Sequence, residues 1–278
     1  MTAPESISRR RFLRTLTLGA CAFPLSSALA SMGREFGLHP ATPFMQLPPG
    51  PLTNPPVMLP PFRSALVSTP HLALTFDDGP HGSLTPRLLD ILAQRNVKAT
   101  FYVIGRNVET YPEIARRIVE EGHEIANHTW SHPALSGLPA DRVAEELRRT
   151  HEVVLQTTGV RMTNLRPPYG AYNDRVREVA FHGHGYDTIM WSVDPLDWKY
   201  RNSARVTREL VTGATPGAVL LCHDIHPTTV AAIPPVLDDL LGRRFEFVTI
   251  DKLMAMDKSG RQDSNLRPPG PKPGALPS

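Results

Sequence analysis

The sequence predicts an α/β fold, a distorted (β/α)7 barrel built from parallel strands. Short apolar runs alternate with amphipathic ones between residues 71 and 256, as in successive βα units. Seven such units within roughly 185 residues favour a barrel over an open doubly wound sheet. The chain has 278 residues and a hydrophobic content of 41%, which is enough to bury this core.

The seven apolar runs define the strands, and the segments between them have helix signals. We predict strands, in chain order, at residues 71–76, 98–104, 124–127, 163–166, 187–192, 218–222 and 245–250. Pro86 and Pro112 suit the first positions of helices, while Gly122 and Gly159 suit positions just after helix ends. A helix between strands is the connection that parallel strands require.

Polar and aromatic residues gather at the ends of five predicted strands. They are Asp77 and Asp78 after the first, His128 and His132 after the third, residues 166–170 at the fourth, Asp194, Asp197 and Trp198 after the fifth, and His223, Asp224 and His226 after the sixth. In parallel α/β folds, ligands bind at the carboxyl ends of the strands. The clusters therefore predict one active site at the C-terminal strand ends.

Two of these clusters suit a metal ion. His128 and His132 are four residues apart, so we expect them on one face of a helical turn, where they can bind one metal. A carboxylate from Asp77 or Asp78 would complete an open site with a position for water, and the second carboxylate could act as a base. There is an alternative for each cluster. The two histidines could be unrelated residues of a polar turn, and Asp77 and Asp78 could belong to an Asp-Asp-Gly-Pro turn formed for its turn chemistry.

Three further residues suit proton transfer. Arg166 would hold a neighbouring carboxylate ionised, with a surface ion pair as the alternative. His223 ends an apolar strand and suits a proton donor. A hydrogen bond from its ring to an acid such as Asp197 would keep it protonated near neutral pH.

Together the clusters resemble a known family. The motifs "TFDDGP", "HTWSH", "RPPYG", "DPLDW" and "LCH" are similar, in order, to the five motifs of the polysaccharide deacetylase family, also called the NodB homology domain or carbohydrate esterase family 4. The similarity runs from about residue 72 to about residue 254. It implies that Asp77 is the general base, oriented by Arg166, and that the backbone N–H of Tyr169 stabilises the oxyanion. It also implies that Asp197 tunes His223, the general acid.

The resemblance further implies a metal ion and a substrate groove. One divalent ion, usually zinc, with cobalt or another divalent ion as an alternative, would be held by Asp78, His128 and His132. The groove would be lined by Pro167, Trp198 and Leu221.

The activity that the resemblance implies is metal-dependent removal of N-acetyl groups from a cell-wall polysaccharide, with release of acetate. The sequence is most similar to family members that act on N-acetylglucosamine in peptidoglycan. Chitooligosaccharides and the O-acetyl groups of xylan are alternative substrates, because the same residues cleave both bonds. A non-catalytic glycan-binding protein and an iron oxygenase with two histidines and one carboxylate are alternatives from other classes.

Residues 1–30 are predicted to be an export signal of the twin-arginine type. Residues 8–14, "SRRRFLR", are basic, a short apolar run follows, and residues 28–30, "ALA", suit a cleavage site. A basic amphipathic surface helix is one alternative, and lipid attachment at Cys21 is another. We therefore expect an exported protein of the periplasm, the cell envelope or the medium.

The other segments and the charge limit the partners. Residues 31–70 are predicted to be a Pro-rich leader, 71–256 the deacetylase domain and 257–278 a disordered tail. The apolar run of the signal is too short to span a bilayer. Residues 1–30 contribute the whole formal net charge of +3, so the rest of the chain is neutral, which argues against nucleic acid as a partner. We expect a monomer without an intramolecular disulfide, because Cys222 is the only cysteine after residue 30.

Overall fold

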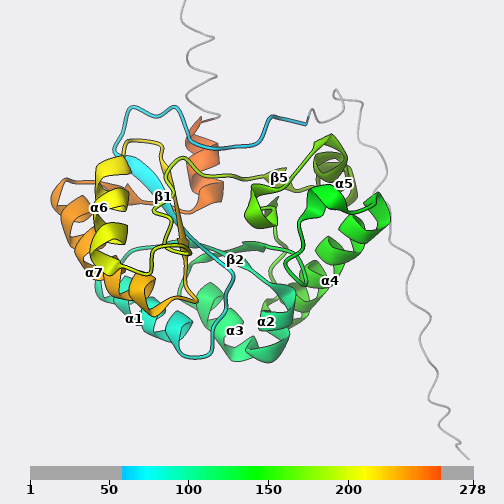
Figure 1. Ribbon diagram of the computed structural model, residues 1–278, viewed down its shortest axis with the longest axis horizontal. Coiled ribbons are helices and arrows are strands. Elements are labelled where there is room, and N and C mark those ends of the chain that lie inside the picture. The colour runs from blue at the N-terminus through cyan, green and yellow to red at the C-terminus, as the bar shows by residue number, and fades with distance from the viewer. Residues whose placement is uncertain (1–57, 258–278) are drawn as a thin grey trace, which may run out of the picture. The chain divides into compact units, whose positions relative to one another are not determined.

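The computed structural model describes residues 58–257, which form alternating strands and helices (Figure 1). The strands are β1 (His71–Asp77), β2 (Thr100–Val103), β3 (Glu124–Asn127), β4 (Asn164–Leu165), β5 (Asp187–Thr188), β6 (Val219–His223) and β7 (Glu246–Phe247). The helices are α1 (Leu84–Gln94), α2 (Gly105–Thr110), α3 (Pro112–Glu120), α4 (Ala140–Thr158), α5 (Asp174–His184), α6 (Ser203–Gly213) and α7 (Pro227–Gly242), with short 3-10 turns η1 (Leu135–Gly137) and η2 (Pro168–Gly170). Residues 250–257 are also helical.

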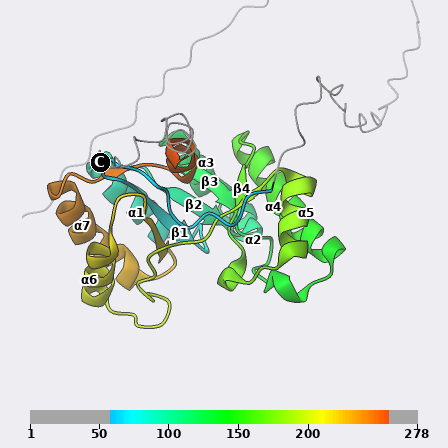
Figure 2. The ribbon, with the colours of Figure 1, turned by 90° about the horizontal axis from the view of Figure 1, so that it is seen from above.

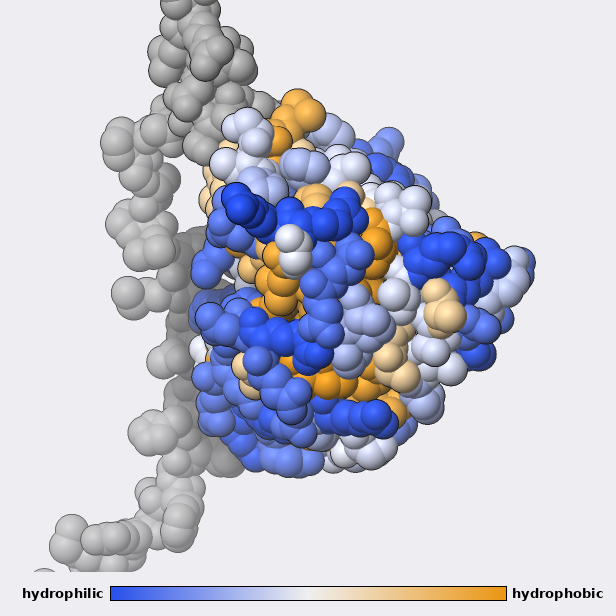
Figure 3. All heavy atoms as spheres, turned by 90° about the vertical axis from the view of Figure 1, so that its left-hand side faces the viewer, coloured by the Kyte–Doolittle hydropathy of each residue, from blue (hydrophilic) through white to orange (hydrophobic). Residues whose placement is uncertain are grey.

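The seven strands form one parallel sheet, which confirms the predicted fold class. Their order is β5-β4-β3-β2-β1-β6, and β7 pairs with the first two residues of β1. Helices cover the outside, with α6 and α7 on one side of the strands and α4 and α5 on the other (Figures 1 and 2). Figure 3 shows that the side with α6 and α7 is mainly hydrophilic.

Several element ends differ from the predicted ones. β4, β5 and β7 have two residues each. β4 is short because Pro167 and Pro168, which follow it closely, have no N–H to donate to a ladder. Pro112 is the first residue of α3 as predicted, but Pro86 is the third residue of α1, whose N-cap is Ser83. No helix among residues 58–257 is both long and apolar enough to cross a bilayer.

Single-residue bridges span the space between β5 and β6, the two outer strands of this order. Val193 pairs with Leu220, Phe62 pairs with Ile189, and Ser64 pairs with Ala218. Residues 62–64 belong to the predicted leader, and in the structure they lie between these two strands. The predicted signal, the leader up to residue 57 and the tail from residue 258 lie outside the described residues.

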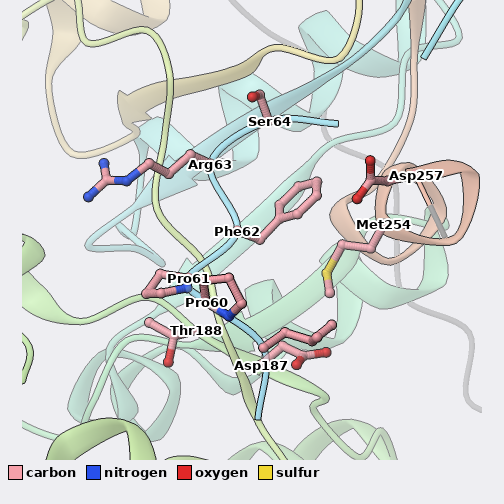
Figure 4. Close-up of a pocket in the computed structure, with 10 residues that line it drawn as sticks. Pro60, Pro61, Phe62, Arg63, Ser64, Asp187, Thr188, Met254 and Asp257 are labelled. Carbon is pink, nitrogen blue, oxygen red and sulfur yellow. The ribbon is translucent and has the colours of Figure 1, made fainter. Parts of the chain in front are cut away.

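The same part of the leader lines a cavity of about 460 Å³. Figure 4 shows the Phe62 side chain directed to the side where Met254 and Asp257 lie, with Pro60 and Pro61 near Thr188. None of the predicted site residues lines this cavity. We therefore place the candidate chemistry elsewhere, in the second cavity described below.

The alternation of side chains along β1 and β6 directs the functional groups inward. Leu72, Leu74 and Phe76 belong to the large cluster that packs against the helices, whereas Ala73 belongs to the smaller inner cluster. By this alternation Asp77 lies on the inner side, and its register partner on β6 is His223. Cys222, one residue before His223, is buried in the outer cluster. Two predicted proton-transfer residues therefore lie side by side at the same level of the barrel.

A half-buried glutamate lies at the start of β3. Glu124 accepts hydrogen bonds from Asn164 Nδ2 at 2.7 Å, Thr100 Oγ1 at 2.8 Å and the Asp251 N–H at 3.2 Å. Burial and the neighbouring Asp251 carboxylate raise the pKa of Glu124 from 4.5 to about 7. Because the folded state holds this proton more tightly than the unfolded state, stability falls as the pH rises from about 4.5 to about 7.

We predict that Glu124→Gln removes this loss. The free energy of unfolding of the variant, relative to the wild type, should rise by roughly 2 kcal/mol between pH 4.5 and pH 7.5, because the amide is neutral at both values. Urea unfolding at several pH values measures the difference, with Glu120→Gln, an exposed position on α3, as the control. If the free energies of unfolding of Glu124→Gln and the wild type differed by the same amount at every pH, this would contradict a raised pKa of Glu124.

Candidate active site

A second cavity of about 460 Å³ lies at the C-terminal ends of the strands. It brings together most of the predicted site residues, and its lining is Asp77, Asp78, His128, His132, Pro167, Tyr169, Trp191, Asp194, Trp198, Leu221 and His223. Arg166 and Asp197, the two other predicted residues, are fully buried and hydrogen-bonded to residues of this lining. The structure therefore collects all the predicted positions around one space.

Three of these residues form a metal-ligating group. One donor atom from each of Asp78, His128 and His132 lies within 4.8 Å of the other two. Asp78 Oδ1 is 3.4 Å from His128 Nε2 and 3.1 Å from His132 Nε2. Burial alone would raise the pKa of the Asp78 carboxyl, but the two imidazoles lower it well below its ordinary value. An ionised carboxylate with two imidazoles fits a divalent metal such as zinc.

The far nitrogen of each imidazole is already engaged. His128 Nδ1 lies 2.7 Å from the Arg166 carbonyl oxygen, and His132 Nδ1 lies 3.0 Å from the Tyr169 hydroxyl. The carbonyl can only accept, so Nδ1 of His128 is the donor and its Nε2 is left as the electron-pair donor, whereas the Tyr169 hydroxyl can donate or accept. The Nε2 atoms of both rings face Asp78. The contact with Arg166 thus selects, for His128, the tautomer that binds a metal.

The two histidines do not lie on a helical turn, which corrects the sequence prediction. They belong to an irregular loop after β3, in which Thr129 has a φ of 71° and His132 a φ of 62°. Asn127 Oδ1 accepts the Thr129 N–H at 2.8 Å, and Thr129 Oγ1 accepts the His132 N–H at 3.0 Å. These two side chains stabilise a backbone path that a non-glycine residue rarely takes, and that path brings both rings to one side.

A carboxylate from α4 holds the same loop from outside. Glu146, which is 8% exposed, accepts the Ser131 N–H and the Ser131 hydroxyl, each at 2.8 Å. Ser131 immediately precedes His132. Because both oxygens of the carboxylate are used, the contact fixes the position and the rotation of this peptide. The sequence shows Glu146 only as one acid in a charged helix.

Arg166 supports the side of the cavity that contains Asp77. Its guanidinium donates to Asp77 Oδ1 at 2.7 Å, to Thr75 Oγ1 at 2.7 Å and to the Met190 carbonyl at 3.0 Å. It also lies 4.0 Å from the centroid of the Tyr102 ring. Neither Arg166 nor Asp77 is more than 3% exposed, so this is a buried pair and not a surface ion pair.

His223, which is half-buried, and the fully buried Asp197 form a second pair on the other side. His223 Nδ1 lies 2.7 Å from Asp197 Oδ1, and Asp197 Oδ2 accepts from the His223 N–H and from the Thr229 hydroxyl. Burial alone would lower the pKa of the His223 imidazole, but the hydrogen bond with Asp197 outweighs it and raises that pKa to about 9. His223 is therefore protonated at neutral pH.

Asp224 supports the turn that follows β1. It is fully buried, accepts a short hydrogen bond from Thr85, and packs so closely on Gly79 that a Cβ there would lie 2.5 Å from its carboxyl oxygen. Burial raises its pKa to about 7. Asp224 thus contacts the residue next to Asp78 without lining the cavity.

Sequence reasoning missed one lining residue and underestimated another. Trp191 was not singled out, although a tryptophan near the C-terminal end of the predicted strand 187–192 was a usable signal. Asp194 belongs to the cluster after the fifth predicted strand, but the resemblance implies no role for it. It accepts the Leu196 N–H at 2.8 Å, as a capping acid does, and it also lines the cavity.

Comparison with known proteins identifies the family. Residues 66–189 match the family described as "Polysaccharide deacetylase". A peptidoglycan-N-acetylglucosamine deacetylase of Bacillus cereus is 36% identical over 191 residues, which are 67% of this chain and 69% of that protein. The chain belongs to the polysaccharide deacetylase family.

Two further relatives show how far the likeness extends. The peptidoglycan-N-acetylglucosamine deacetylase PgdA of Listeria monocytogenes is 47% identical over 182 residues, 66% of this chain and 38% of that protein. The structure of peptidoglycan deacetylase PdaC from Bacillus subtilis is 36% identical, with a TM-score of 0.67 over 72% of this chain and 96% of that one. The chain spans about two fifths of the length of PgdA and PdaC themselves.

The family also includes a protein without activity. BA3943 of Bacillus anthracis, described as a pseudoenzyme of carbohydrate esterase family 4, has a TM-score of 0.67 and 27% identity over 71% of this chain and 69% of that one. The fold alone therefore does not establish catalysis. The residues around the cavity have to support it.

We predict that Glu146→Gln weakens metal binding about tenfold, because an amide in place of the carboxylate cannot accept both Ser131 bonds and the loop with His132 loosens. Competition with a chromophoric chelator measures the dissociation constant for Zn²⁺. Glu145→Gln is the control, since Glu145 is the exposed neighbour on α4 and pairs with Arg148. Thermal melting of the metal-free proteins shows whether both fold. An unchanged dissociation constant in a folded Glu146→Gln protein would refute this role.

Proposed function

We propose that the protein is a metal-dependent hydrolase that removes the N-acetyl group from N-acetylglucosamine residues of peptidoglycan. One observation carries the proposal: the Asp78, His128 and His132 group lies in a single cavity with Asp77 on one side and protonated His223 on the other. A ligand set, a base and an acid around one space are the parts that hydrolysis of an amide needs.

Zinc is the metal that we propose for Asp78, His128 and His132. A divalent ion there would act as a Lewis acid that lowers the pKa of a bound water and polarises the acetyl carbonyl. The three protein ligands leave coordination positions open, as in hydrolytic zinc sites.

The protein's own groups would divide the proton transfers between them. Asp77 would accept the proton of the attacking water, and Arg166 holds its carboxylate in place. The left-handed backbone of Tyr169, with a φ of 59°, lies beside the cavity, where its N–H would stabilise the negative charge on the carbonyl oxygen. His223 would then donate its proton to the leaving nitrogen.

The substrate follows from the names of the relatives and the shape of the site. PgdA and the Bacillus cereus protein are named for N-acetylglucosamine in peptidoglycan. Trp198, which is 50% exposed at the cavity, offers an aromatic face on which a sugar ring can stack. Export through the signal of residues 1–30 is part of this proposal, because peptidoglycan lies outside the cytoplasm.

The test is acetate release by the purified protein from peptidoglycan, chitooligosaccharide and acetylated xylan, with and without a chelator and with zinc added back. We predict chelator-sensitive release that is fastest on peptidoglycan. If acetate were released fastest from chitooligosaccharide or acetylated xylan, that polymer would be the preferred substrate. No acetate release from any of the three would refute the proposed activity.

We predict that Asp77→Asn lowers turnover at least about a hundredfold while the Zn²⁺ dissociation constant changes little, because Asn cannot accept the proton. His128→Ala should lose both zinc and turnover. The two variants distinguish the role of the base from that of the metal ligands. Near-normal turnover by Asp77→Asn would show that another group is the base.

The pH dependence gives an independent prediction. His223 must be protonated to act as the acid, so kcat/KM should fall on the alkaline side near pH 9. In Asp197→Asn the pKa of His223 should fall, because the hydrogen-bonded negative charge is lost. The alkaline limb of the pH profile of kcat/KM should then move to lower pH by at least about one unit. Asp194→Asn, which removes a nearby charge without that hydrogen bond, is the matched control. An alkaline limb that stays in place in Asp197→Asn would contradict His223 as the acid.

A further inference from the structure

The loop between β5 and α6 forms one wall of the cavity and continues beyond it. Asp194 and Trp198 line the cavity, and Tyr200 lies two residues further along. Among the described residues the large aromatic side chains that stay exposed are Tyr169 at 72%, Trp198 at 50% and Tyr200 at 39%. Two of these three line the cavity, and Tyr200 extends the aromatic surface away from it.

Positive charges surround Tyr200. Lys199 Nζ lies 5.2 Å from the centroid of the Tyr200 ring, and Arg205 Cζ on α6 lies 3.9 Å from it. Arg201, which follows Tyr200 in the chain, donates from Nη1 to the Asp197 carbonyl oxygen at 2.8 Å, so a third cation lies on the same loop. Figure 3 shows the hydrophilic side of the molecule on which α6 lies.

These charges have no anionic partner within the described part of the chain. No carboxylate of residues 58–257 lies within ion-pair distance of Lys199, Arg201 or Arg205. Arg208, one turn further along α6, pairs with Glu209 at 2.9 Å. In addition, Arg205 Nε is buried and has no hydrogen-bond partner among the described residues. A cation that is partly buried without a partner suits an anion supplied by a ligand.

The distance along the chain limits where that anion lies. Lys199 and Tyr200 directly follow Trp198, and two residues span at most about 7 Å, so this end of the cationic patch lies roughly one sugar unit from the Trp198 face. Peptidoglycan carries carboxylates on the peptides attached to alternate sugars, whereas chitin-like polymers are neutral. We propose that Lys199, Arg201 and Arg205, with the Tyr200 ring, form a subsite that binds a carboxylate attached to the glycan next to the acetylated sugar. This inference rests on the proposed function, because it concerns the choice of polymer by the same site.

The test compares two forms of one substrate. A soluble peptidoglycan fragment with free carboxylates is assayed beside the same fragment with its carboxylates converted to amides, and kcat/KM is measured from acetate release at low salt and at about 0.5 M salt. The wild type should prefer the free carboxylates about fivefold at low salt, and this preference should shrink at high salt. The double variant Lys199→Gln, Arg205→Gln should lose the preference and keep its rate on the amidated fragment.

Two controls make the result specific. Arg201 is left intact because it also contacts the Asp197 carbonyl, and Arg208→Gln removes a cation of the same helix that already has a partner. Arg208→Gln should keep the wild-type preference. Equal rates of the wild type on both fragments, or an equal loss on both in the double variant, would overturn the subsite while the proposed activity stands. Release of acetate from neither fragment would overturn the proposed activity and the subsite with it.

Discussion

The buried guanidinium of Arg166 joins parts of the site that come from separate strands. Its side chain donates to Thr75 and Asp77 of β1 and to the Met190 carbonyl after β5, while its own carbonyl oxygen accepts from His128 after β3. A charge with no exposed surface is stable only when such partners surround it. The same contacts therefore hold the barrel end together and fix the distance between the Asp77 carboxylate and the metal-ligating group.

The charged groups around the cavity form two pairs that lie on different sides of it. Arg166 with Asp77 occupies one side, His223 with Asp197 the other, and Asp78 lies between them facing the two histidines. Asp77, Asp78 and Asp197 each have a cationic or imidazole partner, so none of these three has to share a proton with another carboxylate. This separation places the Asp77 carboxyl group and the protonated His223 imidazole around one cavity, as the proposed base and acid roles require.

The sequence predicts the strand positions well because their signal is local. Alternation along β1 and β6, which is a local property of the sequence, places Asp77 and His223 inside the barrel and Cys222 outside it. It was not enough for the loops, where the arrangement depends on residues distant in the chain. The spacing of His128 and His132 suggested a helical turn, because nothing nearby in the sequence reveals that Asn127 and Glu146 hold the backbone in another path.

The loops around the cavity concentrate backbone strain. Asp78, Thr129, His132 and Tyr169 all have a positive φ, between 59° and 75°, although none is glycine. Each such conformation costs about 1–2 kcal/mol and persists only where neighbouring contacts enforce it. For the loop of His128 and His132 those contacts are a buried amide from the strand end and a carboxylate from α4. Loss of such a contact would lower metal affinity more than it lowers the stability of the barrel, since the strands do not depend on the loop conformation.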